Sequence, residues 1–327
     1  LDLGHFYASD EPGSRLEPTI EAIRAAGARG VRVRFLLDRR FVDTYPETQA
    51  RLAGFEGVEV RQLDLSGSTG GVLHAKYMVV DGREVYVGSA NFDWRALEHI
   101  QELGLRVADR AVARAVGDVF LYDWLHAGSA PMDSGDIGTP VHAFPARFGS
   151  GTDEVLLTPV FSPECMLPES ALWDLPRLVD LIDSAERTVR LQMLSSSTTD
   201  REGRYFDAIE SALRRAAARR VQVELMCADW SKRRFTIEGL QSLQALPNVT
   251  VKLVTIPQSR VGFIPYARVA HSKYVVVDGR RAWLGTSNFS RDYFHASRND
   301  GFLIDGAAVA RRIDADCTDI WAPEYAR

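Results

Sequence analysis

The chain has 327 residues, of which 46% are hydrophobic and 25% charged, a composition typical of a soluble globular protein. Its length can bury one large core or two of ordinary size. The net charge of −5 excludes a basic surface over the whole protein, so any attraction for phosphate must be local, and no apolar run approaches the roughly 20 residues of a membrane-spanning helix.

The first predicted elements are a helix and a strand within residues 21–38. Apolar residues there recur at helical spacing and then alternate, which indicates an amphipathic helix followed by a half-buried strand. Three strands and a closing helix are expected to follow, at 58–65, 76–80, 85–87 and 110–125.

The same order of elements recurs later in the chain. Residues 211–229 resemble 21–38, and strands are expected at 249–256, 273–277 and 282–284 before a helix at 306–320. Between the copies, 126–158 is rich in Gly, Pro, Ser and Asp, which indicates a linker with room for short edge strands. We therefore predict an α/β protein of two similar halves, 1–125 and 159–327, related by a pseudo-twofold axis.

The chain begins without Met, and its first residues have the pattern of a strand. Residues 183–191 of the second half have the pattern of a helix end, a turn and a strand, and the first half has no counterpart to that helix. We expect that residues upstream were removed and that a signal or anchor segment was lost with them. An exported or luminal location would follow, and the sequence does not fix the compartment otherwise.

Two copies of one motif stand about 200 residues apart. The first contains His74, Lys76 and Asp81, and the second repeats these residue types at the same spacing as His271, Lys273 and Asp278. Each copy is followed at the same distance by a short G-[ST]-x-N tail, which contributes Ser89 and Asn91 in the first half and Thr286 and Asn288 in the second. Identical spacing in both copies indicates one shared active site at the interface of the halves.

The paired motifs resemble those of the phospholipase D superfamily, and the likeness covers nearly the whole chain. Residues 88–97, 265–274 and 285–294 are similar to one branch, which holds the animal lysosomal phospholipase-D-like exonucleases and the poxvirus envelope phospholipase-like proteins. The resemblance implies two α/β/α halves, a phosphohistidine intermediate and no metal or other cofactor.

The residue types fit phosphodiester chemistry, because an anionic phosphodiester requires charge neutralisation in its transition state. Lys76, Lys273, Asn91 and Asn288 are the candidates for holding the phosphoryl oxygens. Residues i and i+2 of a strand share a face, so each motif histidine and lysine should project together. One histidine would attack phosphorus while the other protonates the leaving oxygen and then activates water or an alcohol.

The two halves differ after their asparagines. Glu102 lies 11 residues beyond Asn91, where the resemblance implies a carboxylate that holds the nucleophile's ring, whereas the corresponding residue of the second half is Asn299, followed by Asp300. By the orienting logic of catalytic triads, we predict that His74 is the nucleophile and His271 the general acid and base.

Other residues have supporting or peripheral roles in this prediction. Asp81 and Asp278 precede glycines in tight turns and are expected to support the motifs, while Ser89 and Thr286 should contact phosphate or the motif histidines. Substrate contacts are expected from three residues that lie in a loop or just before the second motif: Lys232, Tyr266 and Arg268. Histidine and cysteine spacing matches no metal site.

Three functions remain open from the sequence. The first is a metal-independent phosphodiesterase on single-stranded nucleic acid, the second a phospholipase D or phosphatidyltransferase on lipid head groups, and the third a non-catalytic binding protein. Intact motifs disfavour the third, and the branch resemblance favours the first. The acidic charge argues against long-range capture of nucleic acid. The sequence predicts no strong amphipathic surface helix, so it offers no such support for a lipid interface either. No obligatory protein partner is evident.

Overall fold

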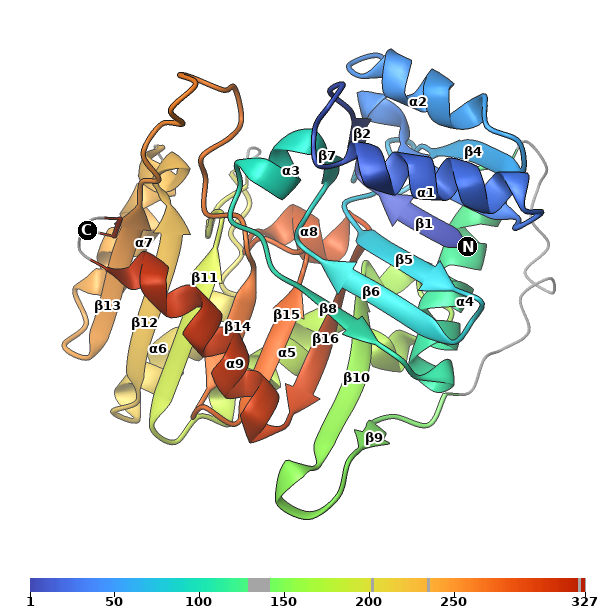
Figure 1. Ribbon diagram of the computed structural model, residues 1–327. Coiled ribbons are helices and arrows are strands. Elements are labelled where there is room, and N and C mark those ends of the chain that lie inside the picture. The colour runs from blue at the N-terminus through green and yellow to red at the C-terminus, as the bar shows by residue number, and fades with distance from the viewer. Residues whose placement is uncertain (129–141, 201–202, 234–235, 323–324, 327) are drawn as a thin grey trace.

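The computed structural model describes residues 1–128, 142–200, 203–233, 236–322 and 325–326. Its strands form two large sheets that stand side by side (Figure 1). The first has the order β4-β3-β1-β5-β6-β8, made of Val58–Leu63, Val33–Asp38, Asp2–His5, Lys76–Val80, Glu84–Gly88 and Gly104–Val107. The second has the order β13-β12-β11-β14-β15-β16-β10-β9, made of Val249–Val254, Gln222–Ala228, Thr188–Met193, Tyr274–Val277, Arg281–Gly285, Asn299–Asp305, Val155–Ser162 and Ala146–Phe148.

The two sheets repeat one topology. In each, three parallel strands are followed by an antiparallel motif strand, β5 or β14, and its hairpin partner, β6 or β15. The second motif strand begins at Tyr274, one residue later than predicted. The repeat of two α/β halves is therefore confirmed, and it places the motifs at equivalent positions near the centre of each sheet.

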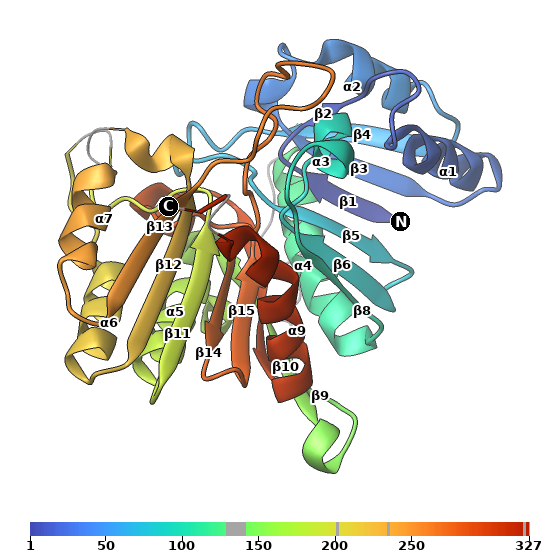
Figure 2. The same ribbon diagram turned by 60° about the vertical axis from the view of Figure 1, so that its left-hand side comes forward.

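Helices cover both faces of the sheets. Between the sheets lie α4 (Arg110–His126) and α9 (Ala307–Thr318), as Figure 2 shows. One apolar core joins the halves there and includes Val116 of α4 and Ile313 of α9. Outside lie α1 and α2 (Glu17–Ala28 and Pro46–Ala53) on the first sheet and α5, α6 and α7 (Asp174–Asp183, Ala208–Ala218 and Ile237–Gln244) on the second. The described residues also form shorter elements, among them β2 (Ala8–Ser9), β7 (Phe92–Asp93), α3 (Trp94–Glu98) and α8 (Arg291–His295).

The connection between the halves is seen only in part. Residues 129–141 of the expected linker 126–158 lie outside the described residues, while β9 lies within that span and β10 begins in it, both at the edge of the second sheet. The division at 126–158 therefore stays a prediction. In the described part of the chain, no helix is long and apolar enough to cross a membrane.

Candidate active site

The motif lysines are buried where the two halves meet. Lys76 begins β5 and Lys273 directly precedes β14, and neither side chain is exposed. Lys76 Nζ donates to the carbonyl oxygen of His74 at 2.6 Å, and Lys273 Nζ donates likewise to that of His271. Burial lowers the pKa of Lys273 to about 7, and burial together with the charge of Lys273 lowers the pKa of Lys76 well below its usual value. Because burial disfavours the charged form of each lysine, an anion bound beside it would stabilise the protonated ammonium group and would itself be held by that charge.

Each motif histidine is anchored to the opposite half. A parallel bridge pairs Leu73 with Arg298, and the backbone N–H of His74 donates to the carbonyl oxygen of Arg298 at 2.8 Å. The second bridge pairs Ala270 with Gln101, and the backbone N–H of His271 donates to the carbonyl oxygen of Gln101 at 2.9 Å. The residue after each bridge partner is thereby placed next to a histidine of the other half.

Those next residues hold the imidazole rings. His74 Nδ1 lies 3.0 Å from Asn299 Oδ1, and His271 Nδ1 lies 2.9 Å from Glu102 Oε1. The Asn299 amide nitrogen donates to the carbonyl oxygen of Tyr293 at 2.8 Å, so its oxygen is the acceptor facing His74. His74 therefore carries its proton on Nδ1 and presents a bare Nε2.

This pairing corrects the expectation from the sequence. Glu102 was predicted to hold the ring of His74, but it holds His271, while the neutral Asn299 holds His74. The reason is that both parallel bridges run between the halves rather than within them. Glu102 and Asn299 do occupy equivalent positions in the two halves, as predicted. Each of them, however, contacts the motif histidine of the other half.

Ser89 and Thr286 act on the orienting residues rather than on the histidines. The Ser89 hydroxyl donates to Glu102, and the Thr286 hydroxyl donates to Asn299 Oδ1 at 3.1 Å. Both hydroxyls are buried and lie at the start of the equivalent tails. The predicted contact with the histidines is therefore indirect, through Glu102 in one case and Asn299 in the other.

The electrostatic setting distinguishes the two histidines. Burial and the charge of Lys76 lower the pKa of His74 well below its usual value, and its Asn299 partner is uncharged. Burial also lowers the pKa of His271, but the carboxylate of Glu102 opposes this shift. Burial is the largest influence and raises the pKa of Glu102, but the charge and hydrogen bond of His271, the charge of Lys273 and the hydrogen bond from Ser89 together leave that pKa below its usual value. His271 is thus better able to hold a second proton than His74.

Three amide atoms of the two tail asparagines have no hydrogen-bond partner among the described residues. Neither amide atom of the buried Asn288 has a partner among the described residues, and the buried Asn91 oxygen has none there either. Asn91 Nδ2 lies 3.3 Å from the hydroxyl of Tyr7, which itself donates to Asp93 at 2.7 Å. Buried amides normally find partners, so these atoms are suited to a ligand.

The aspartates of the motifs lie away from this chemistry. The Asp278 carboxylate accepts three backbone N–H groups, from Glu186, Arg187 and Thr188, at 2.8 to 3.0 Å. Both Asp81 and Asp278 have positive φ, at 51° and 54°, as expected of turn residues. These positions agree with the predicted supporting role.

The three peripheral candidates lie on surface loops. Lys232 is exposed at the end of the turn that follows β12, and Tyr266 is 71% exposed. Arg268 anchors its loop, since its side chain donates to the carbonyl oxygen of Pro257 and its backbone N–H to that of His99. Their contact with substrate stays a prediction.

Two residues near His74 were not identified from the sequence. Tyr293 sets its ring edge-on to the His74 ring with centroids 4.9 Å apart. Asp300 accepts the backbone N–H of Lys76 at 3.0 Å, and burial raises its pKa to about 7. Asn299 stands where the first half has Glu102, so the repeat contained a signal for it, whereas Asp300 stands where the first half has Leu103 and had no such signal.

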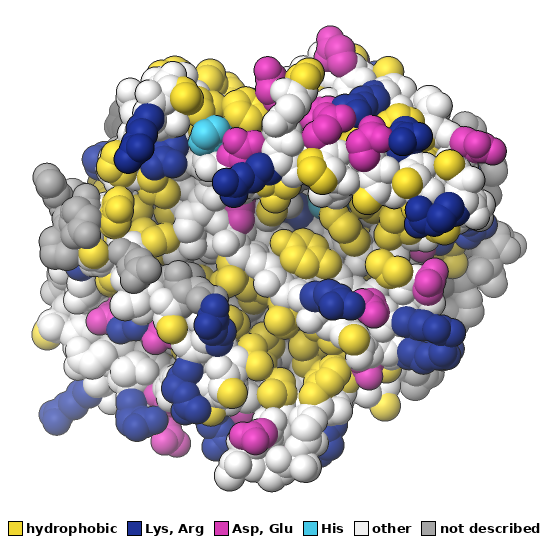
Figure 3. All heavy atoms as spheres, viewed as in Figure 1, with side chains coloured by type: hydrophobic (Ala, Val, Ile, Leu, Met, Phe, Trp, Pro, Cys, Tyr) yellow, Lys and Arg dark blue, Asp and Glu magenta, His cyan; other side chains and the backbone are white. Residues whose placement is uncertain are grey.

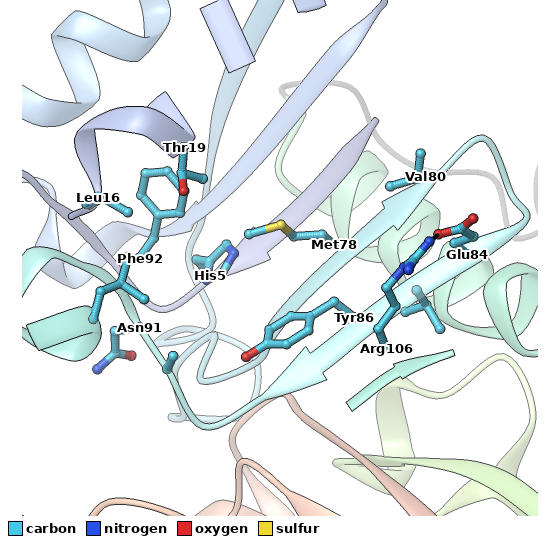
Figure 4. A pocket seen from close by; sticks show the side chains of 13 residues that line it. His5, Leu16, Thr19, Met78, Val80, Glu84, Tyr86, Asn91, Phe92 and Arg106 are labelled. Atoms are coloured by element: carbon cyan, nitrogen blue, oxygen red, sulfur yellow. Dashed lines mark hydrogen bonds and ion pairs between the residues drawn. The ribbon is translucent and has the colours of Figure 1, made fainter. Parts of the chain in front are cut away.

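An apolar cavity of about 410 Å³ opens beside Asn91 on the outer face of β5 and β6. Met78, Tyr86 and Phe92 line it together with the buried His5 (Figure 4). Hydrophobic side chains gather on this face below α1, as Figure 3 shows. The described residues contain no group of three His, Cys, Asp or Glu side chains arranged to hold a metal ion.

The chain is similar to a family model, to two characterised proteins and to a solved structure. A family model described as "Cardiolipin synthase, PLD-like domain" matches residues 1–124 and 178–321. The chain is 32% identical over 285 residues to the 5'-3' exonuclease PLD4 of Mus musculus, which covers 79% of this chain but only 54% of that relative. It is 31% identical over 347 residues to the virion nicking-joining enzyme of vaccinia virus, with 99% of this chain and 80% of the relative covered. The phosphatidylserine synthase of Haemophilus influenzae has the same fold, with a TM-score of 0.64, 12% identity and coverage of 100% of this chain and 81% of that one.

Proposed function

Because this chain belongs to the phospholipase D superfamily of phosphodiesterases, as its paired motifs predicted, we propose that it cleaves single-stranded nucleic acid without a metal, through a phosphohistidine intermediate. The observation that carries this proposal is the shared site itself. Two histidines, each oriented from the opposite half, stand with two buried lysines that have unusually low pKa values.

In the first step, His74 Nε2 attacks phosphorus while its Nδ1–H stays hydrogen-bonded to Asn299 Oδ1. The bond from phosphorus to the leaving oxygen breaks, and His271 Nε2 gives its proton to that oxygen. An imidazolium in a buried site requires a counter-charge, and Glu102 supplies one to His271 only. The resemblance implies a carboxylate beside the nucleophile, which in this structure would select His271; we instead propose His74, because its neutral partner keeps Nε2 unprotonated.

In the second step, the neutral His271 takes a proton from water, and the resulting hydroxide attacks phosphorus and releases His74. Lys76, Lys273 and the two tail asparagines hold the non-bridging oxygens in both steps. Donors placed in advance where negative charge develops are a major source of rate enhancement. The unpartnered amide of Asn288 supports this role.

The substrate proposal rests on the names of the relatives, an exonuclease and a nicking-joining enzyme. One observation favours phospholipid as the second candidate. The loop after β13 exposes three apolar side chains, Val261 at 80%, Phe263 at 75% and Tyr266 at 71%, and exposed apolar groups of this kind suit contact with a membrane surface.

A side-by-side assay with EDTA present distinguishes the candidates. We expect cleavage of short single-stranded DNA with free 5′ ends and no release of choline or glycerol from phosphatidylcholine and phosphatidylglycerol vesicles. Head-group release without DNA cleavage would select the lipid candidate, and loss of all activity in EDTA would contradict the metal-free mechanism. The double variant His74→Ala, His271→Ala should be inactive, whereas His126→Ala, at an exposed histidine, should match the wild type.

The histidine roles are tested by mapping the intermediate. Enzyme quenched in alkali during turnover should carry phosphate on His74, as determined by mass spectrometry of its peptides. Phosphate on His271 would reverse the two roles.

A further inference from the structure

Four aromatic rings lie in mutual contact, and one of them lies against His74. The Phe6 ring has its centroid 4.9 Å from that of His74 and 4.3 Å from that of Phe41. The Tyr7 ring stacks on Phe41 at 5.4 Å and 29°, and on Tyr45 at 5.1 Å and 26°. We call Phe6, Tyr7, Phe41 and Tyr45 the ring cluster.

The ring cluster stands where ligands of α/β sheets usually bind. Phe6 and Tyr7 follow β1, and Phe41 ends the turn that follows β3, so these rings lie beyond the carboxyl ends of two parallel strands. All four rings are partly exposed, and none belongs to the apolar cores of the described residues. Folding therefore leaves aromatic surface uncovered next to the histidine.

In the second half, three of these rings have no aromatic counterpart. The strand registers make Leu3 equivalent to Leu191, since each pairs with the residue four places after its motif histidine. Phe6 and Tyr7 then correspond to Leu194 and Ser195. By the same count Phe41 corresponds to Ser231, because Phe35 and Leu225 are the partners of the two equivalent leucines.

The ring cluster also contacts two of the residues proposed to hold the phosphoryl oxygens, Asn91 and Lys76. The Tyr7 hydroxyl accepts from Asn91 Nδ2 at 3.3 Å, and Lys76 Nζ lies 5.3 Å from the centroid of the Phe6 ring. Arg39 and Arg40 are exposed in the turn that contains Phe41. Proteins that bind single-stranded nucleic acid combine aromatic rings, on which bases stack, with cationic side chains that attract the phosphate backbone. The ring cluster and its neighbouring lysine and arginines have this combination.

We propose that the ring cluster is a nucleobase-binding subsite, which holds a base of the nucleotide whose phosphate reaches His74. This inference rests on the proposed nuclease function and gives its substrate specificity a physical basis. Nearly parallel rings with a polar edge suit a planar base better than a flexible acyl chain. The rings would act on binding and positioning, while the chemistry stays with the two histidines.

The test compares substrates with and without bases. The variant Phe41→Leu, Tyr45→Leu removes two rings but keeps apolar volume, and Phe41→Tyr, Tyr45→Phe keeps both rings as its matched control. Each enzyme is given a short single-stranded DNA and the same strand with abasic residues at its 5′ end, in EDTA. We expect the wild type and the control to favour the strand with bases by about ten- to a hundredfold in kcat/KM.

The leucine variant should lose this preference through a higher KM, while its rate on the abasic strand equals that of the wild type. That abasic rate also shows that the variant is folded; if it is lost, Phe41→Leu alone replaces the double change. A leucine variant that keeps the full preference, or a wild type that never had one, overturns the subsite and leaves the nuclease proposal standing. A wild type that cleaves neither strand overturns both.

Discussion

Replacing Lys273 by Met should make the protein more stable and inactive. The lysine is wholly buried, and its pKa falls from 10.5 to about 7 on folding. At about 1.4 kcal/mol for each pH unit, keeping this charge buried costs ~5 kcal/mol at or below pH 7. The variant leaves the carbonyl oxygen of His271 without its donor, which costs about 1–3 kcal/mol. The free energy of unfolding should therefore rise by ~2–4 kcal/mol at pH 7.

The pH dependence tests the cause. Between pH 7 and 10.5 the unfolded wild type holds a proton on Lys273 that the folded protein lacks, so its free energy of unfolding rises with pH over this range. Urea unfolding at pH 6, 7 and 9 should show the advantage of the variant shrinking as pH rises. Lys252→Met is the matched control, because Lys252 Nζ also donates to a backbone carbonyl, that of Trp321, but outside the site. A Lys273 variant that is less stable at pH 7, or an advantage constant with pH, would refute the reasoning.

Three further changes probe other parts of the molecule. Arg298→Met should lower the free energy of unfolding by about 3–5 kcal/mol in chemical denaturation, since it leaves the carboxylate of Asp123 buried without its partner; an unchanged denaturation midpoint would contradict this. Asp278→Ala should cost about 2–4 kcal/mol, because three backbone N–H groups lose their acceptor and the backbone has positive φ, yet kcat should stay near the wild-type value. Glu102→Gln should reduce kcat by about 10²-fold or more and move the alkaline limb of the pH–rate profile to lower pH, because Glu102 raises the pKa of His271; a profile that does not move would exclude this role.

Local patterns were sufficient for the repeated part of the fold. Alternating apolar residues and Asp-Gly turns predicted both motif strands and their hairpin partners, and these elements are present as β5, β6, β14 and β15. Such elements are set by neighbours in the sequence, through the side-chain period of a strand and the chemistry of its turn.

The partner of each histidine could not be predicted in this way. Glu102 is close to His74 in the sequence and 169 residues from His271, yet it holds His271. That choice depends on which backbone segments pair across the interface, at Gln101 with Ala270 and at Leu73 with Arg298. Periodicity contains no information about such long-range pairing.

The ring cluster was missed for a related reason. Phe6 and Phe41 are 35 positions apart and look like ordinary apolar residues in the sequence. They meet because β1 and β3 are adjacent and parallel, which brings the loops after both strands to one edge of the sheet.

The exchange of orienting residues between the halves also sets the time at which activity can arise. Asn299 is 225 residues beyond His74, so a chain under synthesis can complete and fold its first sheet while the tautomer of His74 is still undetermined. His271 leaves the ribosome long after Glu102 but gains its orienting contact only when the second sheet has formed against the first. Both histidines thus acquire their partners in the final stage of folding. During most of synthesis the nascent chain therefore has no assembled site.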